Sequence, residues 1–328
     1  MHSLKDELTT LTIGTGVNFR GLTLFPLSRS PVATSEPEYL LFDEAVQQGL
    51  ARIVELGGGG SVPELQFENK GPRPVLLVDG EELVGAKQNR ALNLTILAPP
   101  KKTIVIPVSC VEAGRWNMRS NETFSPAPHV MFANARASRT ADVTSSMRTS
   151  GLRRSDQSEV WSNIARKAAN MNAKSPTGAM SAVYERHALS IEGYVHHFTC
   201  DPQECGVLFA LGKHVMGMDL FDHPATMKRM FSKLLRSYAV DAIEKPDGLA
   251  AGEQSAERFI QRISDCQAFT EPAVGLGKDV RLGGSATGGA LWERNRYVHL
   301  CAFVQDVCPK LESRISQPGR RRHRAEQI

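Results

Sequence analysis

The 328-residue chain has no uninterrupted apolar run that approaches the 18 residues of a candidate transmembrane helix. Its first residues, MHSLKDELTTLTIG, carry charges early and contain no apolar stretch of signal-peptide length. Its six cysteines include no CxxC pair, which argues against a structural zinc site, and they do not suggest a disulfide framework in so long a chain. We therefore expect a soluble, cytoplasmic protein with reduced thiols and no membrane association.

Common catalytic signatures are missing as well. Neither GxSxG nor HExxH occurs. The stretch GGGGSVPEL lacks both the Lys-Ser/Thr ending of a phosphate-binding loop and the spacing of a dinucleotide fingerprint, so it predicts a turn. His196 and His197 fall in a predicted strand, where neighbouring side chains point to opposite faces and do not easily share one ion. The sequence therefore predicts no set of metal ligands.

Positive charge is concentrated at the end of the chain. The formal net charge is +4, and residues 316–328 carry four arginines and one glutamate. We expect a basic, disordered tail over 313–328 that keeps the protein soluble. No aromatic platform accompanies Arg320, Arg321, Arg322 and Arg324, and the rest of the chain is near neutral. A nucleic-acid partner is therefore not favoured. Only the basic tail and the basic residues of 119–189 support it, and this support is weak.

Short apolar runs separated by Gly and Pro dominate residues 1–118. The pattern predicts strands near 9–27, 51–56, 63–69, 74–83, 88–97 and 102–110, with a short helix that begins near Asp43. Strands at this spacing predict an antiparallel β-sandwich or jelly-roll-like region.

The rest of the chain predicts a helical bridge and a mixed region. Residues 119–189 are rich in Ser, Thr, Ala and Arg, which predicts a polar, basic, partly mobile bridge with two helices, the first over 161–173. Residues 190–312 predict a smaller β-hairpin-plus-helices region that packs on the first. Its expected strands are 190–200, a hairpin over 207–221 that turns at Gly212-Lys213, and segments near 271–282 and 296–304. Its expected helices begin at Pro224 and after a cap at Ser255. The fold class is α+β, and one composite domain over 1–312 is the alternative to separate domains.

GEELVGAKQNR (80–90) is the most distinctive polar stretch. As a hairpin it places Gly85 near the bend, with residues 81–83 facing 89–91 and a glutamate opposing Arg90 or Lys87. Such an ion pair contributes only ~0.2–1 kcal/mol when exposed. When buried, it needs the hydrogen-bonding groups that Gln88, Asn89 and Asn93 supply. The pattern alone leaves a solvated turn and a binding site open.

Two other groups of polar residues are weaker candidates for a functional site. Cys110 lies near Arg115 in the sequence, and an arginine lowers a thiol pKa, although a small buried residue at a strand end is the favoured interpretation. Asp219, Asp222 and His223 precede a predicted helix, and we expect Asp222 to cap it rather than to bind metal or take part in catalysis.

The stretch LLVDGEELVGAKQNRALNLTILAPPKKTIVIPVSCVEAGRW (76–116) closely resembles the signature of the bacterial ARPP family. The family is named as the ADP-ribosylglycohydrolase- and rhodanese-phosphatase-superfamily-associated protein domain, and its molecular function is not known. Three later stretches are similar to the same family: SPTGAM (175–180), GVLFALGKHVMGMDLFDHP (206–224) and GLGKDVRL followed by GGSA (275–286). The resemblance spans nearly the whole chain apart from the tail.

The resemblance implies a link to ADP-ribose and NAD-derived metabolites without an established reaction. The acidic candidates for catalysis are Glu81, Glu82 and Glu112, which would bind ribose, hold a divalent cation such as Mg²⁺ or activate water. Trp116 would stack on adenine, although a Trp buried at the end of a sheet is more common. Cationic and amide side chains bind phosphates, so the ligand-binding candidates are Lys87, Gln88, Asn89, Arg90, Asn93, Arg115 and Trp116.

Two functions remain open. The first is that the chain binds or processes a small molecule of the ADP-ribose or NAD type in a pocket around 81–93 and 110–116. If the chain is an enzyme, the expected reaction is hydrolysis. Alternatively, it is a non-catalytic accessory protein of such a system, and the polar hairpin organises an interface with a protein partner. A binding function needs these polar groups to converge in a concave pocket, whereas an interface leaves them on a flat surface.

Overall fold

The computed structural model describes residues 3–30, 36–57, 61–117, 123–246 and 248–304. These residues form eight helices and eighteen strands, and the α+β class with mostly antiparallel sheets is confirmed. The predicted tail over 313–328 lies outside the described residues. Within the described ranges, no helix is both long and apolar enough to cross a membrane.

One large sheet combines strands from both ends of the chain. Its order is β1-β3-β13-β14-β18-β17-β16-β15, and β2 also pairs with β3. The predicted hairpin at Gly212 is confirmed as the β13–β14 pair. The sheet comprises β1 (Leu11–Ile13), β2 (Val17–Phe19), β3 (Leu22–Arg29), β13 (Glu204–Leu211), β14 (His214–Phe221), β15 (Gln267–Pro272), β16 (Lys278–Gly283), β17 (Ala286–Glu293) and β18 (Arg296–Val304).

The region predicted as a β-sandwich or jelly roll contains a closed six-stranded barrel in the order β11-β6-β5-β12-β8-β9. The sixth strand comes from the segment predicted as a polar bridge: β12 pairs with both β5 and β8 and so joins the two edges of the sheet. The barrel comprises β5 (Ala51–Glu55), β6 (Glu64–Asn69), β8 (Glu81–Gly85), β9 (Arg90–Leu92), β11 (Lys102–Cys110) and β12 (Thr123–Val130). A three-stranded sheet consists of β4 (Leu40–Leu41), β7 (Val75–Leu77) and β10 (Ile96–Ala98).

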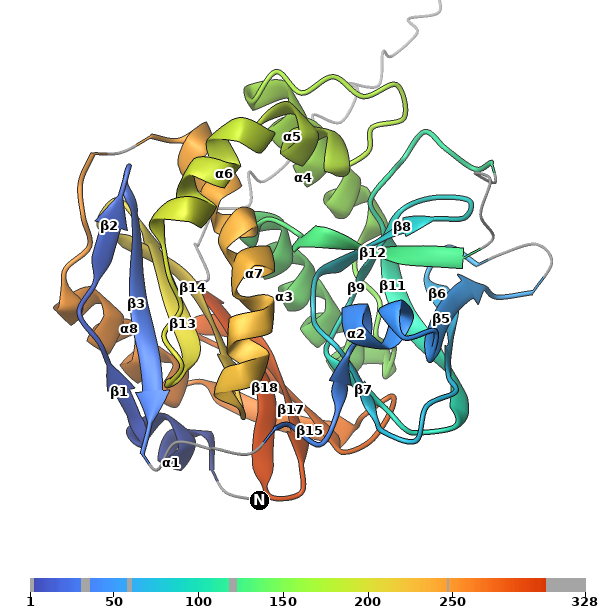
Figure 1. Cartoon of the computed structure of the whole chain (residues 1–328), viewed down its shortest axis with the longest axis horizontal. Coiled ribbons are helices and arrows are strands. Elements are labelled where there is room, and N and C mark those ends of the chain that lie inside the picture. Colours follow the sequence, from blue (N-terminus) through green and yellow to red (C-terminus); the bar gives the residue numbers. More distant parts are fainter. Residues whose placement is uncertain (1–2, 31–35, 58–60, 118–122, 247, 305–328) are drawn as a thin grey trace, which may run out of the picture.

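Helices lie between and around these sheets. In Figure 1, α7 and α3 occupy the middle of the molecule, with the barrel on one side and the large sheet on the other. The predicted start of α7 at Pro224 is confirmed, but the cap is His223, whose Nδ1 accepts from the amide of Ala225, and not Asp222. The helices are α1 (Leu4–Thr9), α2 (Phe42–Gln47), α3 (Ala133–Ser150), α4 (Gln157–Asn170), α5 (Ser181–Arg186), α6 (Ala188–His197), α7 (Pro224–Glu244) and α8 (Glu253–Ser264).

Three helices differ from the sequence prediction. Helix α8 begins at Glu253 with Gly252 as its N-cap, and not after a cap at Ser255. Residues 133–150, assigned to the polar bridge, form the 18-residue helix α3. The predicted strand over 190–200 is wrong, because residues 188–197 form helix α6 and bury Ile191 and Tyr194, three positions apart. His196 and His197 therefore lie on a helix, and the His197 ring stacks on Phe19 with centroids 4.1 Å apart.

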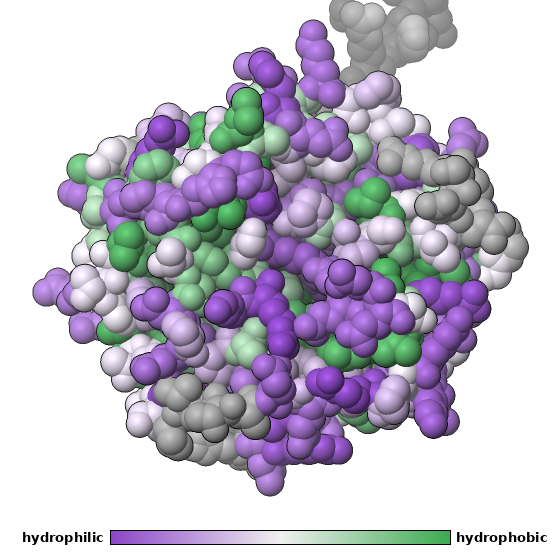
Figure 2. Space-filling model, in the orientation of Figure 1, coloured by the Kyte–Doolittle hydropathy of each residue, from purple (hydrophilic) through white to green (hydrophobic). Residues whose placement is uncertain are grey.

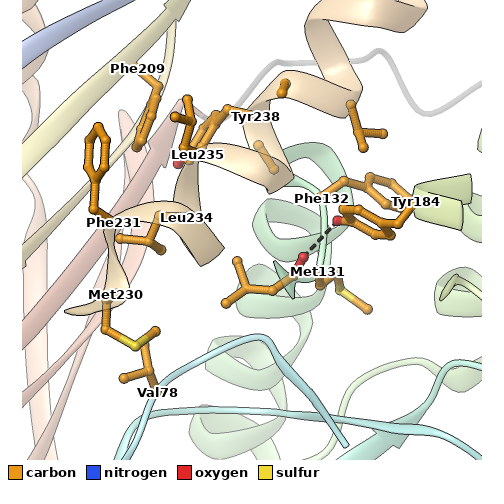
Figure 3. Close-up of a cluster of buried hydrophobic side chains, with 14 of the residues drawn as sticks. Val78, Met131, Phe132, Tyr184, Phe209, Met230, Phe231, Leu234, Leu235 and Tyr238 are labelled. Atoms are coloured by element: carbon orange, nitrogen blue, oxygen red, sulfur yellow. Dashed lines mark hydrogen bonds between the residues drawn. The ribbon is translucent and has the colours of Figure 1, made fainter. Parts of the chain in front are cut away.

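A single apolar cluster joins the two halves around α7. Figure 3 shows α7 side chains, among them Met230 and Leu234, in one cluster with Phe209 of β13 and with Val78 next to the barrel. Each large apolar side chain fully buried in this way contributes ~1.5–3 kcal/mol. On the face shown in Figure 2, hydrophilic residues surround separate apolar patches. The packing of α7 therefore fixes the barrel relative to the large sheet.

Candidate functional site

The signature stretch forms a hairpin whose polar side chains are buried. Glu82 pairs with Ala91 and Leu83 with Arg90 across β8 and β9, and the chain bends after Gly85, as predicted. Gly85 has a φ of 143°, and a Cβ there would lie 2.5 Å from the carbonyl oxygen of Thr123 on β12, so only glycine fits. Seven of the predicted site residues are less than 6% exposed: Glu81, Glu82, Gln88, Asn89, Arg90, Asn93 and, outside the hairpin, Glu112.

Glu82 is held by an amide and an imidazole. Its Oε1 accepts from Asn89 Nδ2 at 3.0 Å, and its Oε2 lies 2.6 Å from His129 Nε2 on β12. The His129 ring stacks on Tyr184 of α5 at a centroid distance of 3.6 Å. Glu82 therefore connects the hairpin to β12 and, through that stack, to α5.

Glu81 has a different partner from the one that the hairpin pattern suggested. Its Oε1 accepts from Lys233 Nζ of α7 at 2.8 Å, and its Oε2 accepts from the Val78 amide at 2.8 Å. Lys233 also donates to Asp43 at 2.7 Å. Burial alone lowers the pKa of Lys233, but the carboxylates of Glu81 and Asp43 outweigh it and raise that pKa above its ordinary value. The expected pairing of a glutamate with Arg90 or Lys87 across the hairpin is replaced by this contact with α7.

Glu112 links the two segments that the sequence placed in one site. Its carboxylate accepts from the Asn89 amide at 3.1 Å, from Thr177 Oγ1 at 2.7 Å and from Arg115 Nη2 at 2.7 Å. Burial alone raises the pKa of Glu112, but these hydrogen bonds outweigh it and lower the pKa. Residues 85–90 and 110–115 thus lie together at one end of the barrel.

Arg90 lies at this end of the barrel, where only its Nη1 is hydrogen-bonded to described residues, to Gln88 and to the carbonyl oxygen of Asn89. Its side chain has 0% exposure, and its Nη1 donates to Gln88 Oε1 at 3.0 Å. Its Nε and Nη2 are buried and have no hydrogen-bond partner among the described residues. Burial is the main cause of its lowered pKa. Two guanidinium donors are therefore left unsatisfied inside the protein.

Trp116 covers this guanidinium from the solvent side. Its side chain is 43% exposed, which differs from the buried ring that is the more common fate of such a residue. Lys87 Nζ lies 5.4 Å and Arg90 Cζ 5.6 Å from its ring centroids, both within cation–π range. Arg115, which donates to the carbonyl oxygens of Gly85 and Ala86, adds a third cation. Lys87, Arg90, Arg115 and Trp116 are called the barrel-end cluster below.

Asn93 and Cys110 have separate environments. Asn93 accepts from Ser109 Oγ at 2.5 Å and donates to the carbonyl oxygen of Arg153. Cys110 lies opposite Arg90 in the β9–β11 pair, and its thiol donates to Gln88 Oε1 at 3.2 Å. Burial raises the pKa of Cys110 and outweighs the effect of Arg90, and the favoured interpretation of Cys110 as a small buried residue at a strand end is confirmed.

Sequence reasoning missed a second buried network next to the signature. Asp79 accepts from Arg136 Nε at 3.1 Å and from Arg139 Nη2 at 2.7 Å, both on α3. Arg136 also donates twice to Asp219, at 2.7 and 3.2 Å. Burial alone raises the pKa of Asp219, but Arg136 and the hydrogen bond with His299 outweigh it and lower that pKa to about 2. Asp79 lies within the signature stretch 76–116, directly before Gly80, and this position was the only sequence feature that pointed to the network.

Neither a metal cluster nor a described cavity includes the signature acids. In the ranges that the structure describes, no group of three or more His, Cys, Asp or Glu side chains is arranged to hold a metal ion. The described cavities of about 580 and 210 Å³ are lined by residues outside 81–93 and 110–116. These two cavities therefore do not decide between the concave pocket and the flat surface that would separate the two hypotheses.

Comparison with known proteins gives one match. Searches of curated proteins and of solved structures find nothing similar. A family model described as the ARG and Rhodanese-Phosphatase-superfamily-associated Protein domain matches residues 10–303. This match extends over the barrel, the helices and the large sheet, so the chain belongs to the ARPP family.

Proposed function

We propose that this protein binds a small anionic molecule of the nucleotide type, such as an ADP-ribose or NAD derivative, at the barrel-end cluster. The observation that carries the proposal is Arg90, whose Nε and Nη2 point to no acceptor in a buried position. A buried donor without a partner costs ~1–3 kcal/mol. A phosphate oxygen would satisfy both donors through the paired geometry that arginine favours.

The neighbours of Arg90 suit the two parts of such a ligand. Lys87 adds positive charge for phosphates, whereas the charge of Arg115 is already offset by Glu112. The exposed face of Trp116 offers a surface on which an adenine ring would stack. Arg90 itself has no exposed surface, so the proposal requires Trp116 and Lys87 to move aside when the anion enters. Ligand binding should therefore change the environment of the Trp116 indole.

The acidic residues support binding over hydrolysis. Glu81, Glu82 and Glu112 are buried, and each accepts hydrogen bonds from cationic, imidazole or amide groups of the protein. A general base needs access to the water from which it takes a proton. We therefore assign these carboxylates to holding the hairpin and the barrel-end cluster in place.

A titration with ADP-ribose, NAD, ADP and AMP, each with and without Mg²⁺, tests the proposal by melting temperature and by tryptophan fluorescence. A ligand at a hundred times its Kd stabilises the fold by ~2.7 kcal/mol, which raises the melting temperature by several degrees. We expect Trp116→Ala and Arg90→Gln to abolish the shift. The control Arg186→Gln, an exposed residue of α5, should keep it.

The accessory-protein alternative makes the opposite prediction. If none of the four compounds changes the melting temperature or the fluorescence of the wild-type chain, the nucleotide proposal is wrong. The association in the family name would then favour a protein partner. Replacements at Arg90 and Trp116 would in that case leave every ligand measurement unchanged.

A further inference from the structure

A second candidate site lies away from the signature, in the cavity of about 580 Å³. Its walls come from the first turn of α3, the turn between β13 and β14, the last turn of α7, and α8. Ligand pockets commonly measure about 300–1,000 Å³, so the cavity has room for a small molecule. None of the residues of the barrel-end cluster lines it.

Unpaired cations form much of its wall. Lys213 lies in the β13–β14 turn, Lys245 follows α7, and Arg258 and Arg262 lie on α8; all four are exposed. None of them makes an ion pair with another residue of the described ranges. Arg258 and Arg262 are four positions apart, so they occupy one face of α8, where like charges repel by ~0.2–0.5 kcal/mol. An anion in the cavity would offset this repulsion.

The two acids of the cavity, Asp241 and Glu244, share one buried lysine, which offsets one of their two negative charges. Lys167 Nζ lies 2.5 Å from both Asp241 and Glu244. Asp241 also accepts from the Ala133 amide at 2.9 Å, and Glu244 accepts from Asn170 at 2.7 Å. The hydrogen bonds and ion pairs of these carboxylates are thus made with groups such as Lys167, Ala133 and Asn170, and not with the four wall cations. The four wall cations outnumber the one negative charge that Lys167 leaves on these acids, so the wall is positive overall.

Apolar groups complete the lining. Val215 and Met216 of β14 and Phe259 of α8 face the cavity together with the cations. We infer that this cavity is a second ligand site, which binds a small molecule with a phosphate or diphosphate group attached to an apolar or aromatic body. The cations bind the phosphate, and the apolar side chains contact the body. The inference rests on this cavity alone and does not depend on the barrel-end proposal.

Inorganic pyrophosphate is the probe for the charged part. Isothermal titration at constant ionic strength should show binding to the chain with Trp116→Ala, in which the barrel-end cluster has lost its ring. Adding Arg258→Glu and Arg262→Glu should weaken that binding roughly tenfold or more. Arg186→Glu makes the same change of charge per residue on the exposed side of α5 and should leave the affinity unchanged.

Arginine modification by phenylglyoxal locates the bound anion in the unaltered protein. Pyrophosphate should slow the modification of Arg258 and Arg262, read by peptide mass spectrometry, and leave that of Arg186 unchanged. Equal rates with and without pyrophosphate overturn the inference, as does equal weakening by Arg186→Glu, which would indicate a general charge effect. If Trp116→Ala alone removes all pyrophosphate binding, the barrel-end cluster is the anion site and the cavity is not.

Discussion

Replacing Lys233 with methionine tests whether the signature residue Glu81 has a structural role. Lys233 is 8% exposed and Glu81 3%, and their charged atoms are 2.8 Å apart. Methionine keeps much of the side-chain volume but leaves the Glu81 carboxylate buried with one neutral donor, the Val78 amide. Asp43, which is 43% exposed, regains water in place of the lysine.

The expected loss follows from the charge that remains. Removing one member of a buried ion pair costs ~3–5 kcal/mol, because the partner is left uncompensated. This corresponds to a fall in melting temperature of roughly 4–7 °C for a chain of this size. Adding Glu81→Gln to Lys233→Met removes the negative charge that lacks a partner, so the double variant should be more stable than Lys233→Met alone.

Urea unfolding of the wild type, both single variants and the double variant gives the coupling free energy between the two residues. Lys228→Met is the matched control, since Lys228 is an exposed lysine on the same helix and should change stability by no more than ~0.5 kcal/mol. If Lys233→Met destabilises the protein no more than Lys228→Met does, the ion pair does not hold the hairpin to α7, and Glu81 is free for another role.

Two further predictions concern the network behind the signature. The pKa of Asp219 is lowered from 3.8 to about 2, so the ionised carboxylate stabilises the fold above pH ~4, and this stabilisation is lost as the pH falls toward 2. The free energy of unfolding, measured as a function of pH, should therefore fall by ~2 kcal/mol over this range in the wild type and not in Asp219→Asn. Gly80 has a φ of 83°, and an added Cβ would lie 2.8 Å from Arg136 Nε, whereas Gly49 has a φ of 68° and open space. Gly80→Ala should therefore cost more than the ~1 kcal/mol expected for Gly49→Ala in thermal unfolding, and equal losses would contradict the close packing.

The sequence predicted strands and helices where the buried residues are apolar. The amphipathic helix α7 and the hairpin of β13 and β14 follow directly from such patterns. Helix α3 does not, because polar side chains occupy part of its buried face: Arg136, Arg139, Thr140 and Thr144 are all buried. Their spacing of three and four is helical, but a search for apolar periodicity does not detect it.

Helix α6 was missed for a different reason. Residues 190–200 satisfy both an alternating and a three-to-four spacing, and tertiary packing of Ile191 and Tyr194 favours the helix. For the site, the sequence indicated that residues 81–93 and 110–116 belong together, and contacts such as Asn89 with Glu112 connect them. It did not indicate which polar groups are buried, because Lys233 and His129 come from distant parts of the chain.

The order of strands in the large sheet also constrains how the chain folds during synthesis. Strand β3 pairs with β13, so Leu22 lies opposite Leu211 and Ser28 opposite Glu204. The partner of β3 is therefore made about 180 residues later, a delay of roughly 10–35 s at ordinary rates of translation. All six strands of the barrel are made within this interval. The barrel can thus close before β13, the pairing partner of β3, has been synthesised. The large sheet is completed only when β18 has been synthesised.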